Sequence, residues 1–223
     1  MSVTAEEVGP RLEAVRARIA AAGGDLDRVR IVAVTKGQPP EAAATALALG
    51  LLDLGESYAQ ELVPKAAALA GRGARWHFVG RLQRNKVRLV APHVHLWQSV
   101  DRLPLAAEVA RRAPGARVLV QVNASGVEHQ GGCPPAEVPT LVDRCRDLGL
   151  AVEGLMAIGP QGTDAEVRAA FRRVRELADR LDLPERSMGM SGDLEQAVAE
   201  GATIVRIGTA LFGPRRPDRS VGK

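Results

Sequence analysis

One lysine of this sequence stands where its side chain could act as an amine nucleophile. Lys36 ends a β-branched run, 31–35, and is followed by Gly37. Apolar surroundings disfavour the ammonium form of such a lysine, and the free amine can then attack a carbonyl to form a Schiff base. A lysine at a strand end is equally compatible with a solvated side chain, because its long stem reaches water readily. Lys36 therefore indicates carbonyl chemistry only together with other features.

An isolated arginine and several small residues near the C-terminus indicate an anion site. Arg206 lies inside the apolar run 203–208, where a buried unpaired charge is unfavourable, so its guanidinium requires an acceptor. Gly208 lets the backbone approach a ligand closely, and Thr209 adds a hydroxyl. Ser191 precedes a helix start, where backbone N–H groups favour an anion. Two alternatives remain open, namely that Arg206 pairs with a core carboxylate and that Ser191 only caps the helix.

Short β-branched runs that alternate with longer Ala/Leu/Arg-rich segments must position these residues. This alternation is typical of parallel βαβ units. Eight strands is the number that closes a (β/α)8 barrel, and about 200 residues is the lower end of the size range for that fold. The predicted strands are Arg30–Lys36, Leu51–Glu56, Arg75–Gly80, His95–Val100, Arg117–Asn123, Ala151–Ile158, Arg186–Ser191 and Thr203–Gly208.

The segments between the predicted strands have helical periodicity and helix-start signals. Thr163 and Glu166 form a capping-box pattern, and Thr4 with Glu7 predicts an extra helix before the first strand. The helices expected between strands are Pro40–Leu49, Asp101–Ala113, Pro134–Leu148, Thr163–Leu181 and Asp193–Glu200. An open doubly wound sheet is the rival fold, but no G-x-G-x-x-G pattern follows the first strand.

We therefore predict an α/β protein: a single (β/α)8 TIM barrel with an extra N-terminal helix. The length of 223 residues suits one domain over residues 1–223. No linker, repeat or low-complexity tract divides the chain. The polar and basic tail, residues 214–223, is expected to be frayed.

The composition excludes several classes of protein. No run approaches the roughly 20 apolar residues of a membrane span, and the N-terminus lacks the layout of a signal peptide, so we expect a cytoplasmic protein with no membrane partner. Cys133 and Cys145 are the only cysteines, and their spacing fits neither a disulfide framework nor a zinc site. The net charge is only +4. A basic cluster, Arg81–Arg88, has no interleaved aromatic residues for base stacking, so we expect no nucleic-acid partner.

Six ordered motifs carry a resemblance to a known family along nearly the whole chain. They occupy residues 32–36 (VAVTK), 54–58 (LGESY), 76–86 (WHFVGRLQRNK), 154–158 (GLMAI), 187–193 (SMGMSGD) and 205–213 (VRIGTALFG). With these motifs the chain resembles the YggS/PROSC family of pyridoxal phosphate homeostasis proteins. The fold of that family is similar to the N-terminal barrel of alanine racemase.

The resemblance implies a pyridoxal 5′-phosphate (PLP) site in the barrel mouth. By this resemblance, Lys36 holds PLP as a Schiff base and Arg206 faces the pyridine nitrogen. Four residues of the two C-terminal motifs bind the phosphate, and three residues of the second and third motifs lie near the ring. His77 is equally compatible with a hydrogen-bonded core histidine. The implied phosphate ligands are Met190, Ser191, Gly208 and Thr209, and the implied ring neighbours are Ser57, His77 and Asn85.

Three departures from the family pattern affect these assignments. Ser57 stands where relatives usually have asparagine, which puts that ring contact in doubt. Arg81 and Arg84 replace smaller residues and make the surface near the mouth more cationic. The loop Val127–Cys133 lacks the lysine that many relatives carry there, so a secondary PLP-handling role for that lysine does not transfer.

The residue types favour a carrier over a catalyst. An arginine only donates, so Arg206 would leave the pyridine nitrogen unprotonated, which makes the ring a poorer electron sink. Racemisation also needs a second acid or base, which alanine racemase takes from a tyrosine supplied through a C-terminal β-domain of a partner chain. This sequence ends at Lys223 without such a domain, and its only tyrosine is Tyr58 at a predicted helix start. We therefore predict a protein of PLP storage and delivery, without strong catalytic activity, whose partners are PLP and PLP-requiring apo-enzymes.

Two other functions use the same residues. A slow PLP-dependent amino-acid racemase would take its second base from His77 or from water. A cofactor-free Schiff-base lyase acting on phosphosugars would use the same lysine and anion site. Nothing in the sequence marks an interface stripe, so we expect a monomer.

Overall fold

The strands of the molecule close into one parallel barrel. The computed structural model describes residues 3–126 and 131–214. Within them the barrel runs in chain order from β1 to β8, and β1 pairs with both β2 and β8. The predicted (β/α)8 barrel is confirmed, and the open doubly wound sheet was the wrong alternative. The strands are β1 Arg30–Val34, β2 Asp53–Glu56, β3 Arg75–Phe78, β4 Val94–Val100, β5 Arg117–Val122, β6 Ala151–Ala157, β7 Glu185–Ser187 and β8 Ile204–Ile207.

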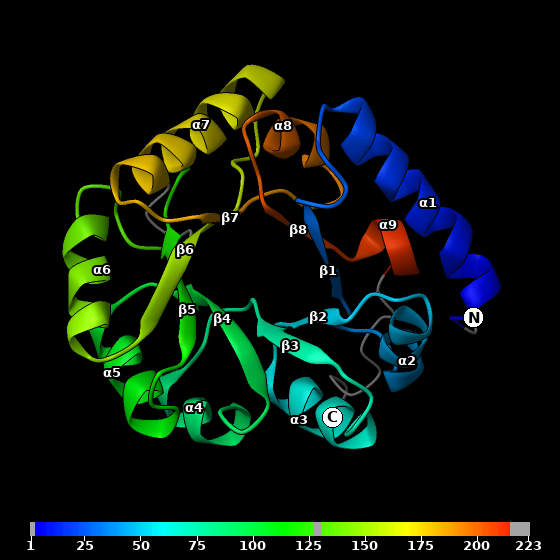
Figure 1. Ribbon diagram of the computed structural model, residues 1–223, viewed down its shortest axis with the longest axis horizontal. Helices are drawn as coiled ribbons and strands as arrows, with labels where there is room; N and C mark the ends of the chain where they lie inside the picture. Colours follow the sequence, from blue (N-terminus) through cyan, green and yellow to red (C-terminus); the bar gives the residue numbers. More distant parts are fainter. Residues whose placement is uncertain (1–2, 127–130, 215–223) are drawn as a thin grey trace, which may run out of the picture.

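Helices surround the barrel as an outer ring (Figure 1). The predicted N-terminal helix is present as α1, where Thr4 accepts a hydrogen bond from the backbone of Glu7, and it packs beside α8 and α9. The predicted capping box of α7, formed by Thr163 and Glu166, is also present. The helices are α1 Ala5–Ala21, α2 Pro40–Ala48, α3 Ala59–Ala68, α4 Arg84–Val90, α5 Leu103–Arg112, α6 Val138–Asp147, α7 Asp164–Arg180, α8 Leu194–Ala199 and α9 Thr209–Phe212.

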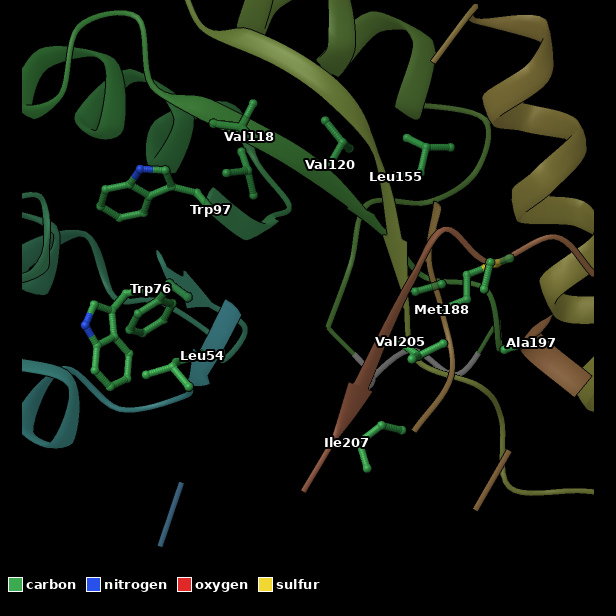
Figure 2. Close-up of a cluster of buried hydrophobic side chains, with 14 of the residues drawn as sticks. Leu54, Trp76, Trp97, Val118, Val120, Leu155, Met188, Ala197, Val205 and Ile207 are labelled. Carbon is green, nitrogen blue, oxygen red and sulfur yellow. The ribbon is translucent and has the colours of Figure 1, made fainter. Parts of the chain in front are cut away.

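The two faces of the strands build two separate apolar regions. Successive strand residues point to opposite faces, so Ala33 packs in the layer between sheet and helices while Val32 faces the barrel interior. The outer layer holds most of the core. Figure 2 shows part of it, including Leu54 and Trp76, which lie opposite each other on β2 and β3. The interior holds a smaller apolar cluster: Val32, Val34, Leu96, Leu119, Met156 and Ile204.

Ion pairs close the barrel at the N-terminal ends of the strands. Arg30 pairs with Glu185 at 3.1 Å, and Arg75 pairs with Asp53 at 2.5 Å. Arg117 makes a further pair, with Glu153. Ion pairs therefore cover this end of the barrel. In (β/α)8 barrels the ligand site lies at the opposite end, at the carboxyl ends of the strands.

Several element boundaries differ from the prediction. β1 ends at Val34, and β7 ends at Ser187 instead of Ser191. Gly189, two residues after the end of β7, has a φ of 90° that is not a strand conformation, and a Cβ there would lie 2.5 Å from Cβ of Ala197 on α8. The helix expected from Pro134 begins at Val138. Residues 127–130 of the lysine-free loop and 215–223 of the predicted tail lie outside the described residues.

Candidate functional site

A pocket of about 280 Å³ opens at the carboxyl ends of the strands. This volume is near the lower end, roughly 300 Å³, of the range for small-molecule sites. Its apolar walls come from Val34, Val79 and Ile158. Six of the nine residues predicted from the sequence line it together, although they come from both ends of the chain: Lys36, Met190, Ser191, Arg206, Gly208 and Thr209.

Lys36 lies in the turn that follows β1, and its side chain is half-buried against the apolar wall. Gly37 makes the turn with a φ of 68°, a conformation in which a side chain is strained. The Gly37 N–H donates to the Glu61 carboxylate at 2.8 Å. The turn that carries the lysine is therefore fixed by a side chain of α3.

A buried cluster around Lys65 also supports this turn. The Lys65 ammonium, 3% exposed, donates to the Thr35 carbonyl at 2.8 Å, to Glu56 at 2.6 Å and to Glu61 at 3.0 Å. Burial raises the pKa of Glu56, although the charge of Lys65 opposes that shift. Our sequence reasoning missed this cluster. The i,i+4 spacing of Glu61 and Lys65 was the available signal.

Arg206 lies at the base of the pocket and is 5% exposed. Its Nη1 donates to the Ser187 carbonyl and to Ser187 Oγ, both at 2.7 Å, and its Nη2 donates to the Ala157 carbonyl at 2.7 Å. No carboxylate of residues 3–126 or 131–214 forms an ion pair with Arg206, so the core-carboxylate alternative was wrong. Burial lowers the pKa of Arg206 to about 10, with the nearby charge of Asp193 opposing, so the guanidinium remains charged at neutral pH.

Small residues form the side of the pocket between β7 and α9. Gly208 runs close to β1, where an added Cβ would lie 3.2 Å from the Val34 carbonyl oxygen, whereas Gly192 faces open space. Ser191 Oγ accepts a hydrogen bond from the Ala210 N–H at 3.1 Å. Ser191 therefore accepts from the first turn of α9 as well as lining the pocket, and the alternative that it only caps the helix α8 was wrong.

One predicted phosphate donor is already engaged within the protein. The Met190 N–H donates to the Asp193 carboxylate at 2.6 Å. The remaining donors on this side of the pocket include the Thr209 hydroxyl and the backbone around Gly192 and Gly208, which line it. Small residues that expose backbone N–H groups are a common means of binding a phosphate.

Three residues predicted to lie near the ring are placed elsewhere. His77 is fully buried, with Nε2 2.8 Å from Asp53 and Nδ1 2.7 Å from Gln98, so both ring nitrogens have protein partners. Asn85 is exposed on α4, because the first turn of that helix faces solvent, and lines a different surface cavity. Ser57 is buried directly after β2 and is not part of the pocket lining. None of these three residues lines the pocket.

Ser57 is held there by a close backbone contact. A Cβ on Gly80 would lie 2.3 Å from the Ser57 carbonyl oxygen, so only glycine allows the loop after β3 to approach. Ser57 Oγ has no hydrogen-bond partner among the described residues. Nearby, Arg81 and Arg84 are exposed, as expected for a cationic surface beside the mouth.

Metal and thiol chemistry receive no support from the described part of the chain. It contains no group of three or more residues suited to hold a metal ion. Cys133 and Cys145 are buried, free thiols, and burial raises the pKa of each to about 11. Because the thiolate is the reactive form, these cysteines are poor nucleophiles.

Comparison with known proteins assigns the chain to a family. Residues 11–216 match the family "Alanine racemase, N-terminal domain". The pyridoxal phosphate homeostasis protein of Pseudomonas aeruginosa is 44% identical, over 96% of this chain and 97% of its own length. The chain belongs to the pyridoxal phosphate homeostasis protein family. Another member, from Aquifex aeolicus, is 40% identical over 95% of this chain and 98% of its own length.

Solved structures of PipY from Synechococcus elongatus have the same fold as this chain. PipY without PLP superposes with a TM-score of 0.82 at 34% identity, covering 92% of this chain and all of PipY. PipY with PLP bound superposes with a TM-score of 0.79 at 35% identity, covering 89% of this chain and all of PipY. The resemblance predicted from the six sequence motifs is confirmed.

Among the residues that the structure describes, no helix combines the length and the apolar character needed to cross a bilayer.

Proposed function

We propose that this protein binds PLP covalently through Lys36 and acts in PLP homeostasis by storing and delivering the cofactor. The observation that carries the proposal is the pocket itself. It gathers one lysine, one buried arginine and a set of glycine and hydroxyl residues that suits a phosphate. Membership in the pyridoxal phosphate homeostasis family supports the proposal, as does the similarity to PipY, whose structure was solved with PLP bound.

The residues that line the pocket fit the chemical groups of PLP. When bound, PLP supplies an aldehyde that condenses with amines and a pyridine ring that withdraws electrons. Lys36 would supply the amine. Arg206 would donate to the ring nitrogen and keep a proton off it, because a guanidinium has no acceptor to offer. Gly208 and Thr209 would hold the phosphate.

The same lining supports a carrier over an efficient catalyst. Apart from Lys36 and Arg206, none of the described residues that line the pocket is titratable. Tyr58 is 53% exposed and lies outside the lining. His77 has both ring nitrogens bonded to protein groups. No second acid or base therefore faces the pocket from these residues, and racemisation requires one.

The proposal includes a cytoplasmic monomer that exchanges PLP with PLP-requiring apo-enzymes. The exposed large apolar side chains are scattered over different elements, from Leu26 to Leu148. Light scattering of the purified protein tests the monomer, and transfer of PLP to an apo-enzyme, measured as recovered activity, tests delivery.

The decisive experiment is the near-visible absorbance of purified protein with added PLP, before and after borohydride. We expect a band that borohydride removes in the wild type and that Lys36→Ala lacks. Lys86→Ala, on the surface of α4, serves as the matched control and should keep the band. Peptide mapping of the reduced protein should locate the adduct on Lys36 rather than on Lys65, Lys86 or Lys223.

Two outcomes would overturn the proposal in different ways. A wild-type protein without the band would reject PLP binding and favour a cofactor-free lyase that is trapped by borohydride only with a carbonyl substrate. Entry of solvent deuterium at Cα of amino acids at ordinary enzyme rates, lost in Lys36→Ala, would replace the carrier by a racemase.

A further inference from the structure

A continuous chain of hydrogen bonds crosses the barrel interior from its N-terminal end to the base of the pocket. It joins one residue from each of five strands: β2, β3, β4, β7 and β8. Successive members are 2.8, 2.7, 2.6 and 2.7 Å apart. Each member is at most 5% exposed. In order, the members are Asp53, His77, Gln98, Ser187 and Arg206.

The chemistry of the two ends fixes the direction of every bond. Arg206 can only donate, so Ser187 Oγ accepts from it and gives its own proton to Gln98 Oε1. Gln98 Nε2 then donates to His77 Nδ1. At the other end the Asp53 carboxylate can only accept, so His77 Nε2 carries the ring proton. Both ends therefore require the same arrangement, with a neutral His77.

The opposite arrangement breaks the chain. If the Gln98 amide were reversed, its Nε2 would face Ser187 and its Oε1 would face His77. Ser187 Oγ would then receive two protons, one of them from Arg206, and its own hydrogen would lose its acceptor. A buried hydroxyl without a partner is unfavourable by the full desolvation penalty. The barrel interior thus selects one state of the chain.

Arg206 is the only one of the five that lines the pocket within the described residues. The other four must therefore affect a ligand through Arg206. Two of the three acceptors of the guanidinium are main-chain carbonyls, which any residue would supply. The Ser187 hydroxyl is the acceptor that depends on residue type, and Gln98 orients that hydroxyl.

We propose that Ser187 and Gln98 are positioning residues that hold the Arg206 guanidinium in one orientation toward the pocket. His77 and Asp53 fix the donor and acceptor roles along the hydrogen-bond chain behind them. Where it concerns PLP, the inference rests on the proposed function. The hydrogen-bond chain within the barrel is present in the protein without cofactor, so it can also be tested without PLP.

The first test measures the PLP dissociation constant of Ser187→Ala and Gln98→Leu by absorbance titration. We expect about tenfold weaker binding for Ser187→Ala, since a hydrogen bond to a charged group is lost. The matched controls are Ser99→Ala on β4 and Gln121→Leu on β5, which change buried residues outside the hydrogen-bond chain. Their PLP dissociation constants should stay within about twofold of the wild-type value.

A double-mutant cycle separates positioning from general damage to the fold. In an Arg206→Met background, Ser187→Ala should have almost no further effect on PLP binding, because its route of action is gone. An equal loss in both backgrounds, or no loss in the wild-type background, would overturn the inference. A shift of the bound PLP absorbance maximum in Ser187→Ala, absent in Ser99→Ala, would support a changed environment of the ring.

The same cycle on the unfolding equilibrium of the protein without PLP keeps the two proposals separate. Ser187→Ala should lower the unfolding stability more in the wild-type background than in Arg206→Met. If the wild type forms no PLP adduct but this coupling is present, the proposed function is wrong and the positioning role of the hydrogen-bond chain is supported. If the adduct forms and the coupling is absent, the inference about the hydrogen-bond chain is wrong and PLP binding is supported.

Discussion

Lys65 and Arg206 are two buried cations of one barrel with opposite surroundings. Lys65, 3% exposed, contacts the carboxylates of Glu56 and Glu61. Arg206, 5% exposed, contacts two main-chain carbonyls and one hydroxyl, and no carboxylate among the residues described. The charge of Lys65 is thus neutralised by direct ion pairs, whereas Arg206 is hydrogen-bonded only to neutral groups, with the charge of Asp193 nearby.

This difference separates a structural cation from one that is held for a ligand. A buried ion pair satisfies both partners and leaves little for a third group. A guanidinium held by neutral acceptors keeps its full charge toward the pocket, where an electron-rich atom can approach. Lys65 therefore uses its buried charge to stabilise the turn that carries Lys36, whereas Arg206 keeps its buried charge available to a ligand in the pocket.

The largest expected effect is on stability when Lys65 is removed. Lys65→Met leaves the fully buried Glu56, and the partly exposed Glu61, without their cation, and we expect a loss of about 3–5 kcal/mol in the free energy of unfolding. Urea unfolding measures it, with Lys86→Met as the surface control. A loss below about 1 kcal/mol would mean that the two cations do not differ as described.

Arg206→Met should show the opposite balance. No carboxylate is left unpaired, so the loss of stability should be only about 1–2 kcal/mol, from carbonyls that lose a donor. PLP binding should weaken by about tenfold or more, since a charged donor at the base of the pocket is lost. Urea unfolding and PLP titration on the same preparation provide both values. A stability loss as large as that of Lys65→Met would contradict the comparison.

The pH dependence of stability should separate the two regions further, because the chain behind Arg206 contains a histidine. Burial lowers the pKa of His77 below its ordinary 6.5, although the hydrogen bond with Asp53 opposes the shift. Between the folded-state pKa and 6.5 the unfolded chain binds more protons, so stability should fall as the pH drops below 6.5. His77→Gln should reduce this fall in urea unfolding series.

A second histidine provides the control for that experiment. Burial also lowers the pKa of His95, and the charge of Arg117 acts in the same direction. His95→Gln should therefore reduce the slope in the same pH interval, but it should leave PLP affinity unchanged. An unchanged slope in His77→Gln would show that His77 is not held neutral in the folded protein.

The smallest effect is expected at Ser57, beside the Lys65 cluster. Its hydroxyl is buried and has no partner within the described residues. Ser57→Ala should raise the free energy of unfolding by about 1 kcal/mol or less, because no hydrogen bond is lost and a buried hydroxyl without a partner is removed. Thermal unfolding of the two proteins side by side measures this. A clear loss of stability would show that the hydroxyl is bound, and that Ser57 takes part in the cluster.

The sequence predicted the barrel and much of the pocket because the relevant signals are local. β-branched runs and helix caps such as Thr163 are read from neighbouring residues. Lys36 and Arg206 stood out because each is a charged residue at or within an apolar run. Since strand ends of a parallel barrel meet at one mouth, their convergence followed from the fold class alone.

The sequence could not show which residues the barrel would pair. His77 and Asn85 share one motif, yet the structure places one in the interior and the other on the surface. Gln98 and Ser187 are 89 positions apart and touch only because β4 and β7 both line the closed barrel. The partners of Lys65 likewise come from separate elements.

By itself, the sequence determined the order and type of the elements and the charged residues at their ends, because these depend on local propensity and side-chain pattern. The tertiary structure alone decided which buried cation meets a carboxylate and which meets only dipoles. That outcome depends on strand register and on closure of β1 against β8, which set Val32 opposite Arg206. Such contacts between distant residues have no signature in the local sequence.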